Sequence, residues 1–280
     1  MSDARLPARP DLAAASLKGK VEATRFVEGI KMRVRVPVAP LRREPRHDAP
    51  LDTEALFGEA VIVYESDSEG WSWVQLAEDS YVGYMPTEAL GPDQIAPTHR
   101  IDALRTFVYP SPSIKEPPLT ALSFGSAIAV TDEEGKFFRT DAGFVFAMHA
   151  KPLAETETDY AGTAERYVGI PYLWGGKSSL GIDCSGLVQT ALRAAGIACP
   201  RDTSMQVNEL GAPIPFDDTL RGLQRGDFVF WKGHVGIMLD ADTLVHANGH
   251  FMEVVSEPLR MARDRTIAKG SGPIIMIRRL

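Results

Sequence analysis

Residues 172–190 read "YLWGGKSSLGIDCSGLVQT" and place a cysteine directly behind a glycine-rich turn. Asp183 is a natural helix N-cap, and the residues after it predict a helix that begins at Cys184 and stops at Gly196. Apolar residues recur along this helix at helical spacing: Leu187, Val188, Ala191, Leu192 and Ala195. The unpaired N–H groups of a helix's first turn lower the pKa of a thiol and can bind an oxyanion. Taken alone, the pattern favours a structural cysteine over a reactive one.

Two histidines further along the chain bear on this choice. His234 lies on one expected strand, in "HVGIMLD", and His246 lies on the next, in "TLVHAN". A hairpin centred on Ala241 would place both on one sheet face as diagonal neighbours about 7–8 Å apart, within reach of linked imidazoles. A shift of one residue would put them on opposite faces. Together with Cys184 they form the combination of nucleophile, base and orienting group that covalent catalysis requires.

Two other motifs in this half of the chain fit less well. His246 and His250 have a spacing that binds metal on a helix, but "HANGH" contains Asn-Gly and indicates a turn, and no carboxylate motif lies beside it. We therefore expect no metal. "GGKSS" is similar to a phosphate-binding loop, but the position five residues before Gly176, where that loop requires glycine, holds Pro171.

The composition is that of a globular protein with enough chain for two or three domains. Of its 280 residues, 44% are hydrophobic and 24% are charged. The net charge of −7 argues against a general nucleic-acid-binding protein, which would usually be basic. One arginine cluster is interpreted as the solvated face of a small domain rather than as a polyanion site: Arg33, Arg35, Arg42, Arg43 and Arg46.

The sequence indicates a soluble protein from a reducing compartment. Its start, "MSDARLPARPDLAAASLKGK", lacks the apolar core of a secretory signal, and no run approaches the about 20 apolar residues that span a bilayer. Cys184 and Cys199 form neither a C-x-x-C motif nor part of a larger disulfide framework. We therefore expect a cytoplasmic protein with no membrane partner.

A weak internal repeat organises the first half of the chain. Residues 56–90 align with residues 123–153, and each segment has Phe-Gly, an alternating apolar strand, an acidic turn ending in glycine, an aromatic strand and a Gly-aromatic pair. Short strands joined by such turns indicate small all-β barrels. The pattern resembles tandem bacterial SH3-like domains, which we place at residues 23–95 and 98–152. Residues 1–22 are predicted to form a flexible or loosely docked arm.

From about residue 155 the pattern changes to helices followed by strands. "TDYAGTAERYVG" predicts a helix capped by Thr158 or Asp159, and the helix at Cys184 is the second. Beyond Pro213 five strand-like runs follow: "DFVFW", "HVGIMLD", "TLVHAN", "FMEVVS" and "PIIMIRR". Helices followed by an antiparallel meander predict an α+β domain over residues 155–280.

The segments "PYLWGGKSSLGIDCSGLVQ", "HVGI" and "LVHA", in that order, resemble the NlpC-type cysteine peptidases. The resemblance covers about residues 155–280 and implies a papain-like fold that cleaves cell-wall peptides. With two SH3-like domains ahead of it, the chain is similar to the γ-D-glutamyl-L-diamino-acid endopeptidases that recycle murein peptides. In that subgroup the N-terminal module narrows the cleft, so that only peptides with a free N-terminal L-Ala-γ-D-Glu enter.

The resemblance also implies a role for each matching residue of the C-terminal domain. Cys184 matches the nucleophile, His234 the base and His246 the polar residue that orients the base. A further group matches residues that line the site, flank the nucleophile or contact the substrate: Tyr172, Asp183, Ser185, Arg201 and Asp202.

The subgroup uses an acidic residue and a tyrosine of its first SH3-like domain to hold the substrate's amino group. Glu54 and Tyr81 are the candidates for this role in the present chain. Asp48 and Asp52 are alternatives to Glu54, because the loop around them aligns weakly. An ordinary solvated carboxylate at position 54 fits the sequence equally well.

The resemblance thus predicts a hydrolase of γ-D-glutamyl-diamino-acid bonds in small murein peptides, working without a metal or organic cofactor. Two alternatives stay open. One is an amidase or acyltransferase that uses the same three residues on another acyl group. The other is a cell-wall peptide-binding protein whose peptidase-like domain is inactive. Both diaminopimelate and lysine fit as the diamino acid, and the sequence predicts no oligomeric state.

Overall fold

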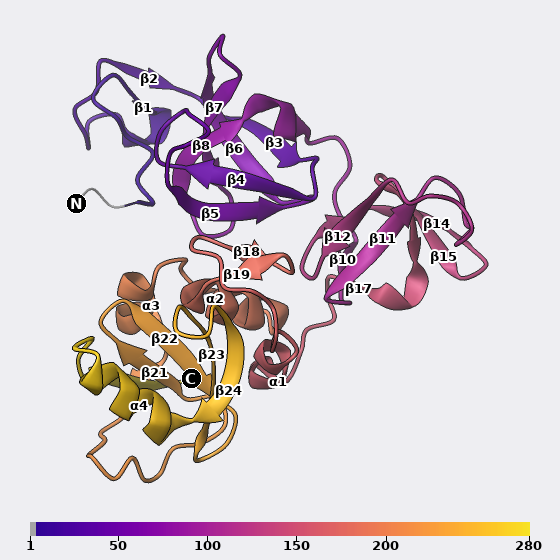
Figure 1. The fold of residues 1–280 in the computed structure, drawn as a ribbon. Coiled ribbons are helices and arrows are strands. Elements are labelled where there is room, and N and C mark those ends of the chain that lie inside the picture. Colours follow the sequence, from indigo (N-terminus) through magenta and orange to yellow (C-terminus); the bar gives the residue numbers. More distant parts are fainter. Residues whose placement is uncertain (1–3) are drawn as a thin grey trace. The chain divides into compact units, whose positions relative to one another are not determined.

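The protein is described from a computed structural model that covers residues 4–280, and residues 1–3 of the expected arm lie outside the described residues (Figure 1). The chain divides into two compact units, Met1–Ala154 and Glu155–Leu280. The first unit is built of strands and short turns, and the second combines helices with a sheet. The change of pattern near residue 155 in the sequence coincides with the division between the two units.

The first module of the N-terminal unit is a seven-stranded antiparallel sheet. Its strands pair in the order β5-β4-β8-β7-β6-β3-β9. Their bounds are β3 (Ile30–Val34), β4 (Val38–Arg42), β5 (Leu51–Leu56), β6 (Ala60–Ser66), β7 (Trp71–Leu76), β8 (Val82–Pro86) and β9 (Leu90–Pro92), with the 3-10 turn η2 (Thr87–Ala89) before β9. Alternate residues of these strands point inward, and Leu41, Val74 and Met85 are fully buried in the core they form.

The second module repeats the element order of the first. Its elements are β10 (His99–Ile101), β11 (Arg105–Tyr109), β12 (Thr120–Ser123), β13 (Ala127–Ile128), β14 (Val130–Glu134), β15 (Phe137–Thr140), β16 (Gly143–Phe146), η3 (Ala147–His149) and β17 (Ala150–Pro152). Strand β3 pairs with β6 and β9, and β10 pairs with β13 and β17. In the same way β4 pairs with β5 and β8, and β11 pairs with β12 and β16. The internal repeat expected from the sequence is therefore confirmed.

The Phe-Gly pair that marks each repeat has a structural reason. Gly58 and Gly125 have φ values of +80° and +85°, a left-handed conformation that glycine adopts without strain. A Cβ at Gly58 would also lie only 1.9 Å from the Ala127 carbonyl oxygen. Phe57, which precedes Gly58, packs into the core of the second module beside Ile101 and other buried residues.

The arm expected at residues 1–22 is not loosely docked over the part that the structure describes. Strand β1 (Leu12–Ala14) pairs in parallel with β2 (Arg25–Val27), and Leu12 is fully buried. Arg9 donates to the Tyr84 hydroxyl at 2.9 Å and to Glu65 at 2.5 Å, and its guanidinium lies 4.5 Å from the centre of the Trp73 ring. The prolines and alanines of the arm indicated a loose segment. Its docking was not predictable from them, because the partners of Arg9 lie on strands more than 50 residues away in the sequence.

The C-terminal unit contains the expected helices and meander. Its helices are α1 (Tyr160–Glu165), α2 (Cys184–Ala194), α3 (Thr203–Glu209) and α4 (Leu259–Ala268), of which α3 and α4 were not expected. A short hairpin, β18 (Lys177–Ser178) and β19 (Gly181–Ile182), precedes α2. The main sheet has the order β20-β25-β21-β22-β23-β24, with bounds β20 (Ala212–Pro213), β21 (Phe228–Trp231), β22 (His234–Met238), β23 (Thr243–Asn248), β24 (Glu253–Pro258) and β25 (Met276–Arg279).

The sheet of this unit has helices packed against it. Helices α1 and α2 contact each other and strands β22 and β23, and α4 contacts β24. Trp231, Met238 and Leu244 of the sheet form a core with Leu259 and Ala262 of α4. Asp159 caps α1 by accepting the Gly162 N–H at 3.0 Å, as the sequence predicted. The packing brings the start of α2 to the strands that carry the two histidines.

No helix within residues 4–280 combines the length with the apolar character that a membrane span needs. The longest, α2, has 11 residues, whereas a helical span takes about 20.

Candidate active site

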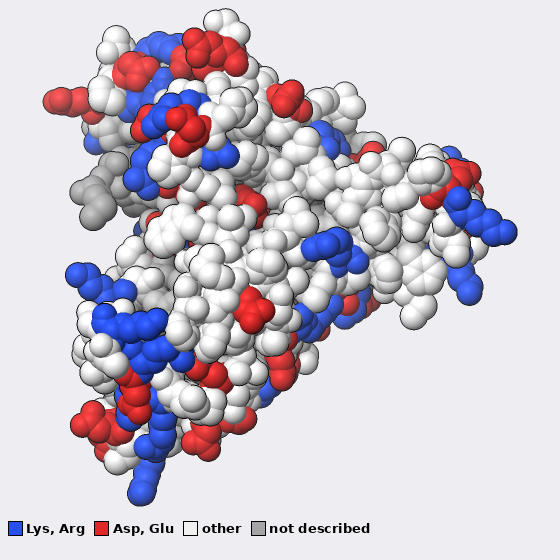
Figure 2. All heavy atoms as spheres, in the orientation of Figure 1, with Lys and Arg blue, Asp and Glu red and all other residues white. Residues whose placement is uncertain are grey.

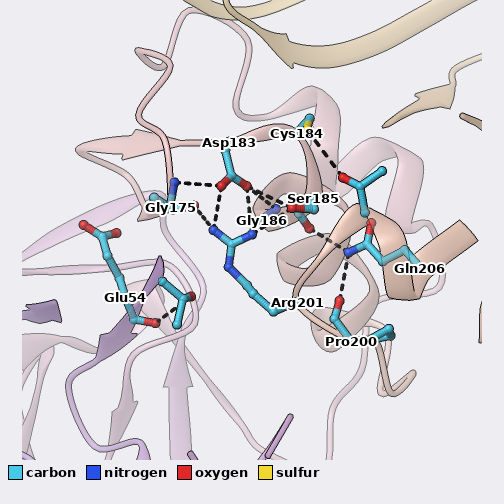
Figure 3. Close-up of polar contacts among 12 residues, drawn as sticks. Glu54, Gly175, Asp183, Cys184, Ser185, Gly186, Pro200, Arg201 and Gln206 are labelled. Carbon is cyan, nitrogen blue, oxygen red and sulfur yellow. Dashed lines mark hydrogen bonds and ion pairs between the residues drawn. The ribbon is translucent and has the colours of Figure 1, made fainter. Parts of the chain in front are cut away.

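The cysteine that opens α2 lies where the sequence predicted. Asp183 caps the helix, because its Oδ1 accepts the Gly186 N–H at 2.7 Å, and Cys184 is the first helical residue. The Cys184 Sγ atom lies 3.8 Å from the Thr203 hydroxyl of α3 (Figure 3). The backbone N–H of Val235, the residue after His234, is a further hydrogen-bond partner of the thiol. The start of α2 and the start of β22 therefore meet at the sulfur atom.

The two histidines lie on one face of the sheet. Strand β22 pairs with β23 in the register Ile237 opposite Val245 and Met238 opposite Leu244, which centres the hairpin on residue 241. His234 Nε2 is 2.8 Å from His246 Nδ1. The predicted diagonal pairing is confirmed. Gly236 of β22 faces His246, and a Cβ at this position would lie only 3.1 Å from the His246 Cβ.

His246 also forms hydrogen bonds with residues that the sequence analysis did not predict as part of the site. His246 is 2% exposed, and its Nε2 lies 2.8 Å from Glu257 Oε1 and 3.0 Å from Asn248 Nδ2. Glu257 in turn accepts two hydrogen bonds from Arg265 of α4, one of them at 2.8 Å. Glu257 lies two residues beyond Val255, the partner of His246, so the alternation along β24 is the sequence signal that could have found it.

Burial controls the protonation of the cysteine and histidine. It raises the pKa of the Cys184 thiol to about 11, and the Asp183 carboxylate adds to this, whereas Thr203 and the Val235 N–H act in the opposite direction. Burial also lowers the pKa of His234 to about 3, and repulsion from His246 and Arg265 adds to the effect. Both groups are therefore neutral at neutral pH. Desolvation therefore opposes the lowering of the thiol pKa that was expected from the helix start, and the net shift is upward.

Asp183 holds together the turn, the helix and a buried arginine. Its Oδ2 accepts the Gly175 N–H at 2.8 Å, and Arg201 donates to Oδ1 at 2.9 Å and to Oδ2 at 2.7 Å (Figure 3). Arg201 is 1% exposed and also donates to the Ser185 hydroxyl at 2.8 Å and the Gly176 carbonyl at 3.2 Å. Arg201 is thus held inside the domain, and its expected contact with a substrate stays a prediction. Asp183 and Ser185 belong to the same buried cluster.

Two other expected site residues lie close to the cysteine. Tyr172 donates its backbone N–H to the Met252 carbonyl at 2.8 Å. Burial raises the pKa of its phenol, with further contributions from the charges of Cys184 and Asp183, which places the ring near the thiol. Asp202 occupies the N-cap position of α3 and directly precedes Thr203.

The candidates for holding the substrate amine lie in the N-terminal unit. Glu54 is a buried residue of β5, and Tyr81 packs into the core of the first module just before β8. The two alternatives to Glu54 have arginine partners: Asp52 is 2.7 Å from Arg43, and Asp48 is 2.8 Å from Arg46.

No group of three or more histidine, cysteine, aspartate or glutamate side chains within residues 4–280 is arranged to hold a metal ion. His250, which the sequence pattern raised as a possible partner of His246 on a metal, has its Nδ1 atom 2.8 Å from Lys269 Nζ.

Charged residues of both signs are interspersed over the face of the molecule drawn in Figure 2.

Each unit contains a segment that matches a known family. Residues 169–268 match the NlpC/P60 family, and residues 41–90 match the SH3 domain of bacterial dipeptidyl-peptidases. A relative from Lysinibacillus sphaericus named dipeptidyl-peptidase 6 is 31% identical over 235 residues, which cover 75% of this chain and 85% of that protein. The chain therefore belongs to the NlpC/P60 family of peptidases.

Two further comparisons agree with this assignment. A Bacillus subtilis protein named γ-D-glutamyl-L-lysine dipeptidyl-peptidase is 29% identical over 237 residues, covering 75% of this chain and 77% of that protein. The crystal structure of an NlpC/P60 family protein from Bacillus cereus has the same fold, with a TM-score of 0.74 and 23% identity, covering 89% of this chain and 99% of that chain. The papain-like C-terminal domain and the first SH3 domain are thus confirmed. The assignment of residues 98–152 to a second SH3-like domain stays a prediction.

Proposed function

We propose that this protein is a cytoplasmic cysteine peptidase that hydrolyses the γ-D-glutamyl-diamino-acid bond of small cell-wall peptides during murein peptide recycling. The observation that carries the proposal is that Cys184, at the start of α2, accepts the N–H of Val235, the residue after His234, while the His234 ring is hydrogen-bonded to His246. The relatives named dipeptidyl-peptidase support the substrate class. The proposed partner is the peptide alone, with neither nucleic acid nor membrane required.

The proposed reaction starts from a neutral thiol and a neutral imidazole. His246 occupies Nε2 of His234, so Nδ1 of His234 is the atom that takes the thiol proton as the sulfur attacks the γ-carbonyl carbon. The N–H groups at the start of α2 stabilise the negative charge on the carbonyl oxygen. His234 then gives the proton to the leaving amine of the diamino acid. A water molecule, deprotonated by His234, hydrolyses the thioester and regenerates the thiol.

Alkylation of the thiol should reflect its raised pKa. Because burial raises the pKa of Cys184 to about 11, only a small fraction is thiolate at neutral pH. We expect the rate of modification by iodoacetamide, followed by intact mass, to rise continuously from neutral pH toward the thiol's pKa. A rate that levels off below neutral pH would show that a thiolate–imidazolium pair already exists in the free protein, and would contradict the neutral resting state.

The free amino group of the substrate provides a test of specificity. We propose that Glu54 of β5, with Tyr81, holds the N-terminal ammonium of L-Ala-γ-D-Glu-diamino acid, the role that the family resemblance implies for these two residues. Loss of a charged hydrogen bond costs about 1.5–3 kcal/mol, so N-acetylation should lower kcat/KM about 10- to 100-fold. Chromatography of the products from free and acetylated peptides measures this ratio. Equal cleavage of both peptides would remove the proposed role.

A matched pair of variants locates the amine-binding residue. Glu54→Gln should abolish the preference for the peptide with a free N-terminal amine over the acetylated peptide. Asp48→Asn changes an exposed carboxylate that pairs with Arg46, and this variant should retain the preference. Parallel assays with lysine and with diaminopimelate as the third residue identify the diamino acid. A preference unchanged in Glu54→Gln would assign the amine to another residue.

A further inference from the structure

A row of four side chains crosses one face of the C-terminal sheet and ends on a helix. His234 of β22, His246 of β23 and Glu257 of β24 are successive diagonal neighbours, because His246 lies opposite Val255, two residues before Glu257. The joining distances are 2.8 Å from His234 Nε2 to His246 Nδ1 and 2.8 Å from His246 Nε2 to Glu257 Oε1. Arg265 of α4 holds the far side of Glu257 with two hydrogen bonds.

The order of hydrogen bonds in this row sets where each proton lies. The hydrogen bonds from Arg265 and His246 outweigh burial and lower the pKa of Glu257 to about 2, so its carboxylate is ionised and accepts hydrogen bonds only. The atom opposite it, His246 Nε2, must then carry a hydrogen. In the tautomer of His246 whose single hydrogen lies on Nε2, the Nδ1 atom accepts, and His234 Nε2 must donate to it. The remaining lone pair of His234 is on Nδ1.

The side chain of Asn248 would reverse these proton positions if its hydrogen bond to His246 were stronger than that of Glu257. Asn248 Nδ2 lies 3.0 Å from His246 Nε2, and the amide cannot turn over, because its Oδ1 accepts the backbone N–H groups of His250 and Phe251. A hydrogen bond from Asn248 to an unprotonated Nε2 would move the His246 proton to Nδ1. It would also leave the Glu257 carboxylate facing a lone pair. The shorter contact and the full charge of Glu257 favour the first arrangement.

We propose that Glu257, held in place by Arg265, is a positioning residue that sets the proton positions of His246 and His234, so that His234 Nδ1 is the free base of the reaction. Its effect on hydrolysis rests on the cysteine-peptidase function proposed above, whereas its effect on the histidine protons does not. Glu257 also stabilises the positive charge that His234 gains when it takes the thiol proton, since the carboxylate raises the pKa of His234. The charged or titratable groups on this row are His234, His246, Glu257 and Arg265, with Cys184, Asp183 and Tyr172 facing the reacting end.

Nitrogen NMR of the ¹⁵N-histidine-labelled full chain tests the proposal without any substrate. A ring nitrogen that lacks hydrogen resonates far from one that carries it, so each tautomer is read directly. We expect His234 and His246 both to carry hydrogen on Nε2 and not on Nδ1 at neutral pH. A His246 spectrum with hydrogen on Nδ1 would overturn the proposal, even if the protein proves to be an active peptidase.

Kinetics of Glu257→Gln test the consequence for catalysis. The variant keeps the side chain's shape but removes its charge, so kcat should fall about 10- to 100-fold, a part of what general base catalysis contributes, while KM changes little. Asp264→Asn is the matched control, since Asp264 is an exposed carboxylate on α4 that contacts only Arg263 among the described residues, and its kcat should stay within about 2-fold. Thermal unfolding confirms that each variant is folded.

The outcomes separate this proposal from the proposed function. A folded Glu257→Gln variant with the kcat of the unmodified protein would show that the carboxylate does not position the histidines for catalysis. If the unmodified protein fails to cleave the γ-D-glutamyl peptide, the proposed function fails, while the NMR spectra still decide the proton positions. In a Glu257→Gln variant that unfolds, the spectra of the unmodified chain decide alone.

Discussion

Replacement of Cys184 by alanine is expected to abolish hydrolysis of a γ-D-glutamyl peptide while the protein stays folded. The sulfur is the atom that would form the thioester, and His234 alone cannot substitute for it, so kcat should fall by about 10⁴-fold or more. The change removes one buried atom, and its cost in the free energy of unfolding should be about 1 kcal/mol. Product chromatography and a thermal melt measure the two effects.

The second cysteine provides the control for this experiment. Cys199 is also buried, and its Sγ lies 3.4 Å from Gln206 Nε2. Because the Cys199 sulfur lies against the Pro200 carbonyl and the Gln206 amide, which are outside the proposed triad, Cys199→Ala should lower the melting temperature slightly and retain hydrolysis. Turnover that persists in Cys184→Ala, or that disappears equally in Cys199→Ala, would remove Cys184 as the nucleophile.

The largest effect on stability is expected at Asp183. Asp183→Ala leaves the Arg201 guanidinium, which is 1% exposed, without its anionic partner, and such a break in a buried ion pair costs about 3–5 kcal/mol. The substitution also removes the N-cap of α2 and the partner of the Gly175 N–H. Urea denaturation followed by circular dichroism measures the loss in the free energy of unfolding.

Asp159 offers a matched control, because it has the same role at an exposed site. It caps α1 and pairs with Arg225 at 2.7 Å, but its side chain is 53% exposed and that of Arg225 is 41% exposed. Asp159→Ala should therefore cost only about 1 kcal/mol. A combined Asp183→Ala, Arg201→Met variant should regain part of the lost stability, because no buried charge is left unpaired. If Asp183→Ala were no more destabilising than Asp159→Ala, the ion pair would not organise the site.

Local features of the fold and site were predictable because neighbouring residues determine them. The Asp183 cap, the apolar spacing of α2 and the glycine stop all lie within 14 residues, and the same holds for the hairpin that pairs His234 with His246. The internal repeat was visible because most of its glycines have positive φ values, which other residues adopt only with strain: Gly58, Gly70, Gly125, Gly135 and Gly143.

The rest depends on contacts between distant segments. Thr203 reaches Cys184 only because α3 packs beside α2, and Arg265 reaches Glu257 only because α4 folds back on β24. The burial that raises the pKa of the thiol and encloses Arg201 is likewise a property of the packed domain. The docking of residues 4–22 likewise depends on distant contacts, because Arg9 binds Glu65 and Tyr84 on strands far along the chain.

Mass spectrometry of the products from two isomeric tripeptides tests the central claim most directly. One peptide is L-Ala-γ-D-Glu-L-Lys, and the other joins the same residues through the α-carboxyl group. The account predicts that the unmodified protein converts the γ-linked peptide to L-Ala-D-Glu and free lysine, leaves the α-linked isomer intact, and does neither when Cys184 is alanine. Cleavage of both isomers at similar rates, cleavage at the L-Ala bond, or no cleavage of either peptide or of its diaminopimelate counterpart would contradict it.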